Sequence, residues 1–325
     1  MLNFCFTALL MLGMSLPGAC HAESVPPVRT PKAVFIIIDG IPADVIESTA
    51  TPNIDAISAA GGYTRAYVGG EVGGESESPT VSAPGYMSLI TGTWCNKHNV
   101  RDNDVAEPDY QYWNIFRIAE AYDTALETAI FSTWQDNRTK LVGDGLDAAG
   151  GFTIDYHFDG LELDSGRFPE DSEGNYISAI DGLVAADAAR EIRVSGPDLS
   201  WVYLQYTDDV AHNHGDSPEF TAAVQLMDER VGQVWQAVQA RQAQFHEDWL
   251  IIVSTDHGRD ATGMEHGEQS ERERTTWIAT NSKRLNAHFR QTPAIVDILP
   301  SLVAHLNLDM PKEIRAQLDG QSFID

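Results

Sequence analysis

The sequence predicts an α/β fold with a mostly parallel central sheet flanked by helices on both faces. Short apolar runs of strand length recur along the chain, at residues 33–38, 128–132, 199–205 and 251–255. Segments with helical periodicity separate these runs. Continuous apolar runs are typical of parallel strands buried on both faces, and strand–helix alternation throughout the chain favours one α/β sheet.

Residues 1–22 are predicted to be a signal peptide. They include no Lys, Arg, Asp or Glu, and Phe6 to Leu16 is an apolar run too short to span a bilayer. Ala22 is a small residue of the kind that precedes a cleavage site. We therefore expect an exported protein, periplasmic or secreted, and residues 23–325 are expected to form a single domain.

The composition argues against several classes of protein. With 48 acidic and 21 basic residues the formal net charge is −27, so duplex nucleic acid is not an expected partner. An anionic substrate would need local positive charge, which bound metal ions could supply. Cys5 and Cys20 lie in the leader, so Cys95 would stand alone in the mature chain and no intrachain disulfide is expected. No segment after the leader is predicted to span a membrane.

The first half of the chain is expected to bring an acid and a hydroxyl to the sheet edge. The first apolar run ends in Asp39, which in isolation could equally be a turn or helix-cap carboxylate. Ser82 is expected just ahead of a helix at 86–90 that ends near Gly92, so it is either a residue served by the helix dipole or an ordinary N-cap. The other elements expected here are a helix starting at Thr51 and Pro52 with Thr51 as its N-cap, a Gly/Glu/Ser-rich loop over 71–78 and a polar loop over 96–103.

The second half offers the remaining candidate ligands. The third apolar run leads to Asp208 and His212, whose four-residue spacing places both on one face of a helical turn. The fourth run ends in Asp256 and His257, and His266 follows in a loop. The other elements expected here are an irregular insertion over 140–174, helices over 179–194, 218–241 and 294–306, and a strand over 276–279.

Six candidate metal ligands thus stand at strand ends and in one loop: Asp39, Asp208, His212, Asp256, His257 and His266. In proteins with an open α/β sheet, bound molecules and ions lie beyond the carboxyl ends of the strands. Three carboxylates and three imidazoles suit two zinc ions. Two metals can clamp the attacking and leaving oxygens of an in-line displacement, so this set with Ser82 predicts a hydrolase of an anionic ester.

The arrangement resembles the alkaline phosphatase superfamily, and most closely its type I phosphodiesterase/nucleotide pyrophosphatase branch. The resemblance covers nearly the whole chain after the leader and implies an alkaline-phosphatase-like fold. The motifs that carry it, in order, are Ile38-Asp39-Gly40, Thr51-Pro52-Asn53-Ile54-Asp55, Ser82-Ala83-Pro84-Gly85, Thr91-Gly92, His98 through Asp102-Asn103, Asp208-x-x-Ala-His212, Asp256-His257-Gly258, His266-Gly267, Asp297-Ile298-Leu299-Pro300 and Leu318-Asp319-Gly320.

The resemblance implies a role for each candidate residue. One zinc would be held by Asp39, Asp256 and His257 and would also touch Ser82, and a second would be held by Asp208, His212 and His266.

The same resemblance makes Ser82 the nucleophile of a covalent phospho-enzyme, where this branch usually has Thr. Asn103 falls at the family's donor to a phosphate oxygen. Ala83 and Gly85 depart from the branch, which usually has an aromatic residue and an Asn there. Because the aromatic residue helps to hold a nucleobase in relatives, its replacement by Ala83 puts nucleotide recognition in question.

The expected function is therefore an exported two-zinc phosphoric ester hydrolase, a phosphodiesterase or nucleotide pyrophosphatase acting on a small-molecule phosphate ester. An alkaline-type phosphomonoesterase on the same site is the main alternative, with Arg101 as its extra phosphate contact. A sulfatase-like hydrolase is disfavoured because Gly85-Tyr86 breaks the sulfatase motif and three His favour zinc over calcium. An inactive binding protein would be expected to lose ligands, and mutases of this fold are usually cytosolic.

Residues 136–189 are expected to be an insertion that builds the substrate pocket. Four of its residues could hold a third cation, although solvated loop acids are the simpler interpretation: Asp144, Asp155, His157 and Asp159. Arg101, Arg259 and Arg272 are candidate phosphate contacts, and Thr80 is the rival hydroxyl to Ser82.

Overall fold

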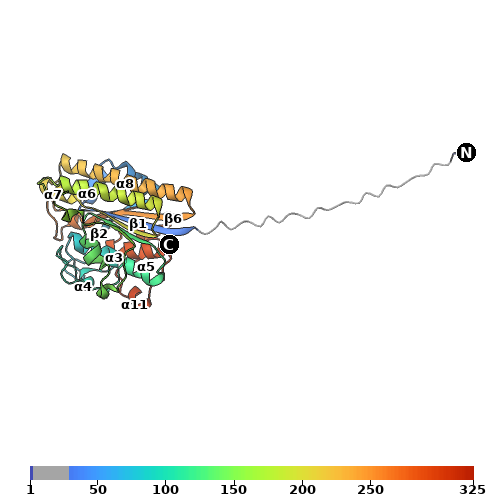
Figure 1. Cartoon of the computed structure of the whole chain (residues 1–325), viewed down its shortest axis with the longest axis horizontal. Coiled ribbons are helices and arrows are strands. Elements are labelled where there is room, and N and C mark those ends of the chain that lie inside the picture. Colours follow the sequence, from blue (N-terminus) through green and yellow to red (C-terminus); the bar gives the residue numbers. More distant parts are fainter. Residues whose placement is uncertain (3–28) are drawn as a thin grey trace.

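The computed structural model describes residues 1–2 and 29–325, so almost all of the predicted signal peptide, with Cys5 and Cys20, lies outside the described residues. The described chain is built around a seven-stranded sheet of order β2-β7-β6-β1-β5-β3-β4 (Figure 1). The strands are β1 (Thr30–Ile38), β2 (Gly62–Tyr67), β3 (Thr128–Ser132), β4 (Tyr156–Phe158), β5 (Leu199–Leu204), β6 (Glu247–Ser254) and β7 (Thr275–Thr280).

The prediction of a mostly parallel sheet is confirmed. Strand β1 pairs in parallel with both β5 and β6, and β3 pairs in parallel with β5 and β4. Strand β7 runs antiparallel to both β6 and β2, which gives the sheet an antiparallel edge that the sequence did not indicate. Because β1, β5 and β6 are adjacent and parallel, their carboxyl ends meet at one edge of the sheet.

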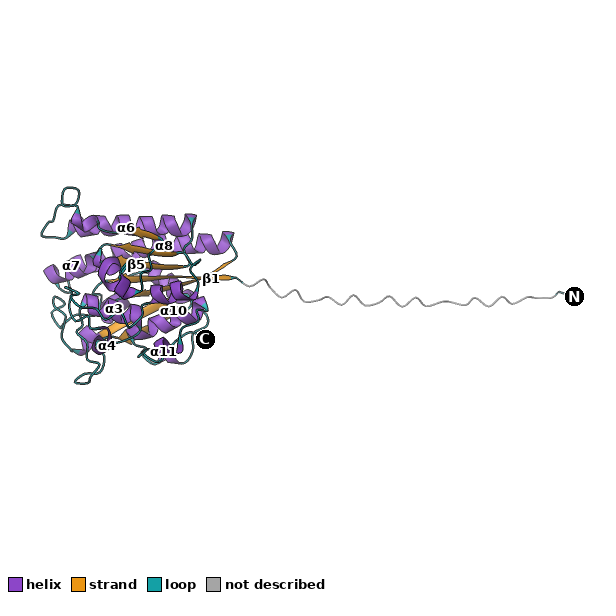
Figure 2. Ribbon diagram, turned by 60° about the horizontal axis from the view of Figure 1, so that its bottom comes forward, coloured by secondary structure: helices purple, strands orange, loops and turns teal. Residues whose placement is uncertain are grey.

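Strand β1 is buried on both faces, which explains its continuous apolar run. Its residues alternate between two core clusters, Phe35 and Ile37 facing one and Ile36 and Ile38 facing the other. Helices α2, α6 and α8 contribute to one cluster and α3, α5 and α10 to the other, so helices cover both faces (Figures 1 and 2). Each fully buried aliphatic side chain contributes about 1.5–3 kcal/mol to this core.

The helices are α1 (Ala43–Ser48), α2 (Pro52–Ala60), α3 (Ser82–Thr91), α4 (Cys95–His98), α5 (Ile115–Tyr122), α6 (Asn175–Val194), α7 (Tyr206–His214), α8 (Pro218–Gln244), α9 (Glu271–Arg274), α10 (Ile298–Leu306) and α11 (Lys312–Arg315). Shorter turns are η1 (Asn137–Val142), a π-helix, and the 3₁₀ turns η2 (Asp147–Ala149), η3 (Leu161–Leu163), η4 (His288–Arg290) and η5 (Ile295–Asp297). The segment expected to be irregular, 140–174, therefore contains part of η1 and adds strand β4 to the sheet edge.

The start of α3 and the capping of α2 differ from expectation. Helix α3 begins at Ser82 rather than at 86, because Pro84 falls in its first turn, where a missing N–H leaves no intrahelical bond unmade. Thr51 occupies the N-cap position of α2 but its side chain makes no capping hydrogen bond. The buried carboxylate of Asp228, from α8, instead accepts the N–H of Ile54 at 2.8 Å and so caps α2 from a distant element.

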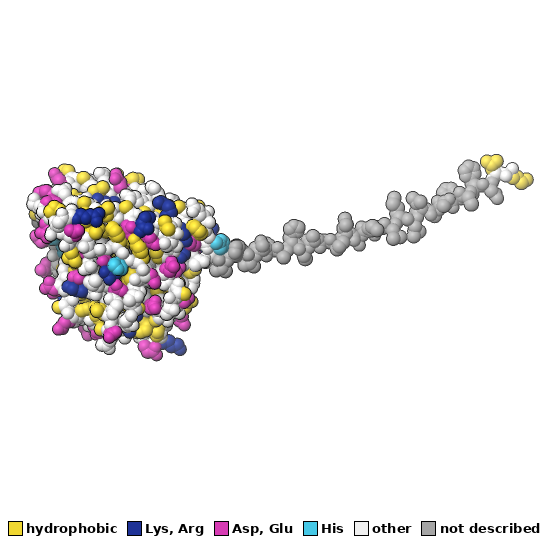
Figure 3. Space-filling view, in the orientation of Figure 1, with side chains coloured by type: hydrophobic (Ala, Val, Ile, Leu, Met, Phe, Trp, Pro, Cys, Tyr) yellow, Lys and Arg dark blue, Asp and Glu magenta, His cyan; other side chains and the backbone are white. Residues whose placement is uncertain are grey.

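Acidic side chains are dispersed over the face of the molecule drawn in Figure 3. They lie among other side-chain types rather than gathering into a single patch. Among residues 1–2 and 29–325, no helix is both long and apolar enough to cross a bilayer.

Candidate metal centre

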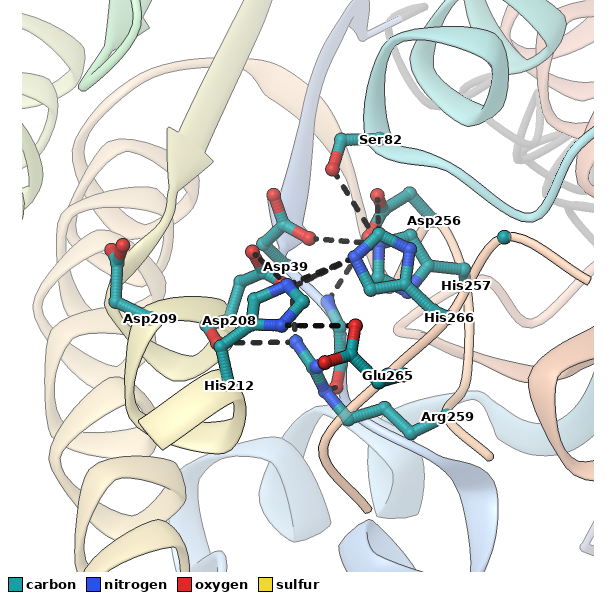
Figure 4. Close-up of polar contacts among 12 residues, drawn as sticks. Asp39, Ser82, Asp208, Asp209, His212, Asp256, His257, Arg259, Glu265 and His266 are labelled. Atoms are coloured by element: carbon teal, nitrogen blue, oxygen red, sulfur yellow. Dashed lines mark hydrogen bonds and ion pairs between the residues drawn. The ribbon is translucent and has the colours of Figure 1, made fainter. Parts of the chain in front are cut away.

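The six candidate ligands converge at the carboxyl edge of the sheet (Figure 4). Asp39 follows β1 directly, Asp256 and His257 follow β6, and Asp208 lies in α7 immediately after β5. The loop that carries His266 reaches the same place, where the Nδ1 of His266 donates to the carbonyl of Thr80 at 2.9 Å. Asp39 and Asp256 are more than 200 positions apart in the chain, yet they are neighbours because β1 and β6 are adjacent in the sheet.

Asp39, Asp256 and His257 form one group of potential ligand atoms. The Nε2 of His257 lies 3.3 Å from Asp39 Oδ1 and 3.3 Å from Asp256 Oδ2. Both carboxylate oxygens are buried and accept no hydrogen bond within the described chain. Because a buried carboxylate oxygen without a partner is costly, this pair of orphaned oxygens fits a cation.

Hydrogen bonds to the other atoms of this group fix its orientation. The Nδ1 of His257 faces the carbonyl of Gly258 at 2.8 Å, so it carries the proton and leaves the Nε2 lone pair for a ligand. The hydroxyls of Tyr86 and Tyr203 both donate to Asp39 Oδ2, Tyr203 at 2.6 Å. These donors turn Asp39 Oδ1 toward His257.

The protonation behaviour of this group reflects its concentrated negative charge. Burial and the neighbouring Asp39 raise the pKa of Asp256 well above its ordinary value. Burial acts to lower the pKa of His257, but Asp256, Asp39 and Asp208 together raise it to about 9. A divalent cation would take the place of the protons that Asp256 and His257 hold this tightly.

Asp208 and His266 belong to a second group of potential ligand atoms that shares His257 with the first, and His212 lies beside this second group. Asp208 Oδ2 lies 3.4 Å from His212 Nε2, which confirms that both share one face of α7, and the Nε2 atoms of His212 and His266 are 3.1 Å apart. The ring of His266 stacks on that of His257 at 3.7 Å between centroids. Burial, followed by His257, lowers the pKa of His266 to about 4, so its imidazole is neutral and able to bind a metal.

Ser82 faces His257 from the first turn of α3. Its Oγ lies 3.5 Å from His257 Nε2 and its side chain is buried. Asn103 is held beside it, because the amide oxygen of Asn103 accepts the N–H of Ala83 at 3.0 Å, which leaves the Nδ2 hydrogens free to donate. The rival hydroxyl of Thr80 is committed elsewhere, since it donates to Glu268 O at 2.7 Å and accepts from Gly267 N at 2.9 Å.

Two glycines allow these elements to approach closely. A Cβ at Gly40, which has φ +68°, would lie 2.8 Å from Asp208 Oδ1 and 2.6 Å from Arg259 Nη2. A Cβ at Gly85 would lie 2.9 Å from both the Cβ and the carbonyl oxygen of Asp256. The glycine that departs from the family pattern at position 85 therefore lets α3 pack against the end of β6.

A cavity of about 250 Å³ opens beside Ser82. Its lining residues are Asp39, Ser82, Tyr86, Asn103, Trp134, Tyr203, Gln205 and Asp208. None of them belongs to the segment 136–189 that was expected to build the pocket. Sequence reasoning missed Trp134 and Gln205, although each lies one or two residues beyond the end of a parallel strand, as the candidate ligands Asp39 and Asp256 do.

The other candidate residues lie outside the cavity. Arg259 is fully buried and bonded to Asp208, and Arg272 pairs with Asp44 and Asp216, so neither is placed to contact a phosphate. Arg101 is exposed and does not line the cavity.

The acids that could have held a third cation are engaged by protein donors. Asp144 and Asp159 both pair with Arg138, at 2.5 and 2.6 Å, and Asp155 accepts from the N–H of Thr128 at 2.8 Å. His157 lies 3.7 Å from Asp159. Asp209, next to a candidate ligand, points away from the metal centre (Figure 4).

Solved structures with the same architecture define the class of fold. The chain resembles a 2-O GAG sulfatase with a TM-score of 0.63 and 15% identity, covering 90% of this chain and 73% of that one. It resembles the phosphonate monoester hydrolase of Agrobacterium radiobacter with a TM-score of 0.61 and 15% identity, covering 90% and 76%. It also resembles murine ectonucleotide pyrophosphatase/phosphodiesterase 5, in an inactive form with AMP, with a TM-score of 0.57 and 12% identity. This match covers 86% of this chain and 96% of that one. The fold is thus alkaline-phosphatase-like, as expected.

The family is shown by the sequence. The family model for type I phosphodiesterase/nucleotide pyrophosphatase matches residues 33–317, and the chain belongs to this family. Member 3 of the ectonucleotide pyrophosphatase/phosphodiesterase family from Rattus norvegicus is 24% identical over 250 residues, 73% of this chain and 26% of the relative. Its Mus musculus counterpart is 23% identical over 282 residues, which are 83% of this chain and 28% of the relative. The chain therefore spans about a quarter of the length of these curated relatives.

Proposed function

We propose that this protein is an exported two-zinc phosphoric ester hydrolase, with one catalytic domain, that favours phosphodiesters and acts through a covalent phosphoserine at Ser82. The observation that carries the proposal is the pair of orphaned carboxylate oxygens, Asp39 Oδ1 and Asp256 Oδ2, that face His257 Nε2 with the Ser82 hydroxyl 3.5 Å from the same nitrogen. Buried carboxylate oxygens almost always have a bonding partner, and a bound cation would supply one for this pair.

The donor types support zinc and a division into two sites. We assign Asp39, Asp256, His257 and the Ser82 hydroxyl to the first zinc and Asp208, His212 and His266 to the second, because nitrogen and carboxylate ligands in this ratio are typical of zinc. Bound zinc would supply positive charge to the phosphoryl oxygens and lower the pKa of a coordinated hydroxyl.

The residues of the chain position the reacting groups. In the proposed reaction Ser82 Oγ loses its proton to solvent and bonds to phosphorus, the bond from phosphorus to the leaving oxygen breaks, and the leaving group takes a proton from water. Water then hydrolyses the phosphoserine and restores the Ser82 hydroxyl. The free Nδ2 of Asn103 would donate to a phosphoryl oxygen, since its Oδ1 is already held by Ala83.

The charge of the cavity favours a diester. Its lining contains two carboxylates and no Lys or Arg. A monoester dianion is commonly bound by a bidentate Arg, whereas the neutral amide of Asn103 is better matched to a diester monoanion. A volume of about 250 Å³ suits a phosphoryl group with a small substituent, and Trp134 offers a flat apolar wall.

The test compares kcat/KM of the zinc-loaded protein for an aryl phosphate and its matching alkyl aryl diester at one pH, alongside an aryl phosphonate and an aryl sulfate. The diester is expected to be preferred. A monoester preference of about tenfold, equivalent to about 1.4 kcal/mol of transition-state binding, would favour the phosphomonoesterase alternative.

Substitution of the nucleophile tests the mechanism separately. Ser82→Ala should lower kcat by about a thousandfold or more while the zinc content stays near two per chain. Ser82→Thr is the matched control. It keeps a hydroxyl, on the residue type that is usual in this branch, and should keep substantial turnover. Full activity of Ser82→Ala, or of protein stripped of metal, would contradict the proposal.

A further inference from the structure

A fully buried arginine stands directly behind the second group of ligands. Arg259 has no exposed surface and follows Asp256-His257-Gly258 in the chain. Its Nε donates to Gly40 O at 3.1 Å and its Nη1 to Met264 O at 2.8 Å. Its Nη2 donates to both the carbonyl and the Oδ1 of Asp208 (Figure 4). A permanent positive charge is therefore fixed against a candidate metal ligand.

The two groups differ in net charge because of this arginine. Once a metal has displaced their protons, Asp39 and Asp256 bring two negative charges to the first group, and no Lys or Arg in the described chain is in hydrogen-bonding contact with either. In the second group the single negative charge of Asp208 is balanced by Arg259. A divalent cation would be attracted strongly to the first group, whereas at the second it would approach a guanidinium.

The ligand oxygens also differ in availability. Asp39 Oδ1 and Asp256 Oδ2 have no hydrogen-bond donor in the described chain. Asp208 Oδ1, which lies 3.6 Å from His266 Nε2 and 4.0 Å from His257 Nε2 and so faces the space between the groups, already accepts from Arg259. A metal at the second group would share that carboxylate with a competing cation.

We infer that the two metals bind with unequal affinity, and that Arg259 makes the site of Asp208, His212 and His266 the weaker one. This inference rests on the proposed two-metal function. Its consequence is that the first site fills at low free zinc and the second fills only at higher free zinc, so that occupancy of the second site limits the active fraction of the protein.

The experiment is equilibrium dialysis of the whole protein against buffers of graded free zinc, with bound zinc measured by elemental analysis. The wild type should fill in two separate steps. Arg259→Met should shift the second step to at least about tenfold lower free zinc and leave the first nearly unchanged. Arg259→Lys, which keeps the charge, should fill its second site close to the wild-type concentration.

Controls separate the local charge from other effects. Arg272→Met removes an equal charge from an arginine that pairs with Asp44 and Asp216 instead of a candidate ligand, so both steps should stay in place. If Arg259→Met does not fold, Arg259→Gln keeps a donor for the carbonyls of Gly40 and Met264 without the charge, and should show the same shift.

The outcomes distinguish the inference from the proposal beneath it. The role of Arg259 would be overturned, with two bound metals retained, if the wild type filled both sites at the same free zinc. It would also be overturned if Arg259→Met or Arg259→Gln filled the second site at the wild-type free zinc concentration or at a higher one. A plateau at one zinc or none in the wild type would overturn the two-metal function itself.

Discussion

His98 should make the protein progressively less stable as the pH falls below 6.5. Its side chain is fully buried, and burial, followed by Arg101, lowers its pKa to about 3. The N–H of Val100 donates to its Nδ1 at 3.1 Å, so the proton sits on Nε2, which donates to Ser88 Oγ at 3.0 Å. Ser88 lies on α3, the helix that begins with Ser82, so the neutral imidazole supports the helix that carries the proposed nucleophile.

The magnitude is set by the difference between the two states. The unfolded chain protonates His98 near pH 6.5 and the folded protein only near pH 3, so the stabilisation is fully present above 6.5 and is lost as the pH falls toward 3. At pH 5 the unfolded chain gains about 2 kcal/mol by this protonation and the folded protein almost nothing. Between pH 7 and pH 5 the free energy of unfolding should therefore fall by about 2 kcal/mol on account of His98.

Urea unfolding of the wild type and of His98→Gln at pH 7 and pH 5 isolates this contribution, because all other titrating groups are common to both. The glutamine side chain would retain a donor and an acceptor without titrating, so His98→Gln should be less stable at pH 7 yet lose about 2 kcal/mol less than the wild type between the two pH values. His214→Gln, at a partly exposed histidine beside Glu173, controls for removing a histidine elsewhere. Equal losses in wild type and His98→Gln would refute the assignment.

Two further substitutions test the packing around the candidate metal centre. Gly85→Ala places a Cβ 2.9 Å from Asp256 Cβ, so α3 must shift by a few tenths of an ångström, and kcat should fall by about tenfold with zinc content retained. The control is Gly182→Ala on α6, whose Cβ would lie 3.7 Å from Arg230 Nη2 and which should leave kcat unchanged. An unaffected Gly85→Ala would mean that the position of α3 does not set the rate. Tyr203→Phe removes one of the two hydroxyls that orient Asp39, and competition with a chromogenic chelator should show the first zinc bound about tenfold more weakly. An unchanged affinity would show that Tyr86 alone holds Asp39 in place.

The parallel core of the sheet and the six candidate ligands could be predicted from the amino-acid sequence alone. Continuous apolar runs such as 33–38 are typical of strands buried on both faces, and adjacent parallel strands bring the residues at their carboxyl ends to one edge. Asp39, Asp208, Asp256 and His257 could therefore be grouped from their positions in the sequence, and the structure places them together. The spacing of Asp208 and His212 likewise required only the period of a helix.

Features that depend on contacts between distant segments arise only in the folded chain. The residues of β7 do not indicate which strands it pairs with, so its antiparallel direction could not be predicted. Nor does it reveal that Trp134 lines the cavity, because nothing marks which side chain beyond a strand end turns inward. Arg259 looked in the sequence like a phosphate contact, yet it is buried against Asp208, since its destination depends on carbonyls of Gly40 and Met264 that only folding brings within hydrogen-bond range.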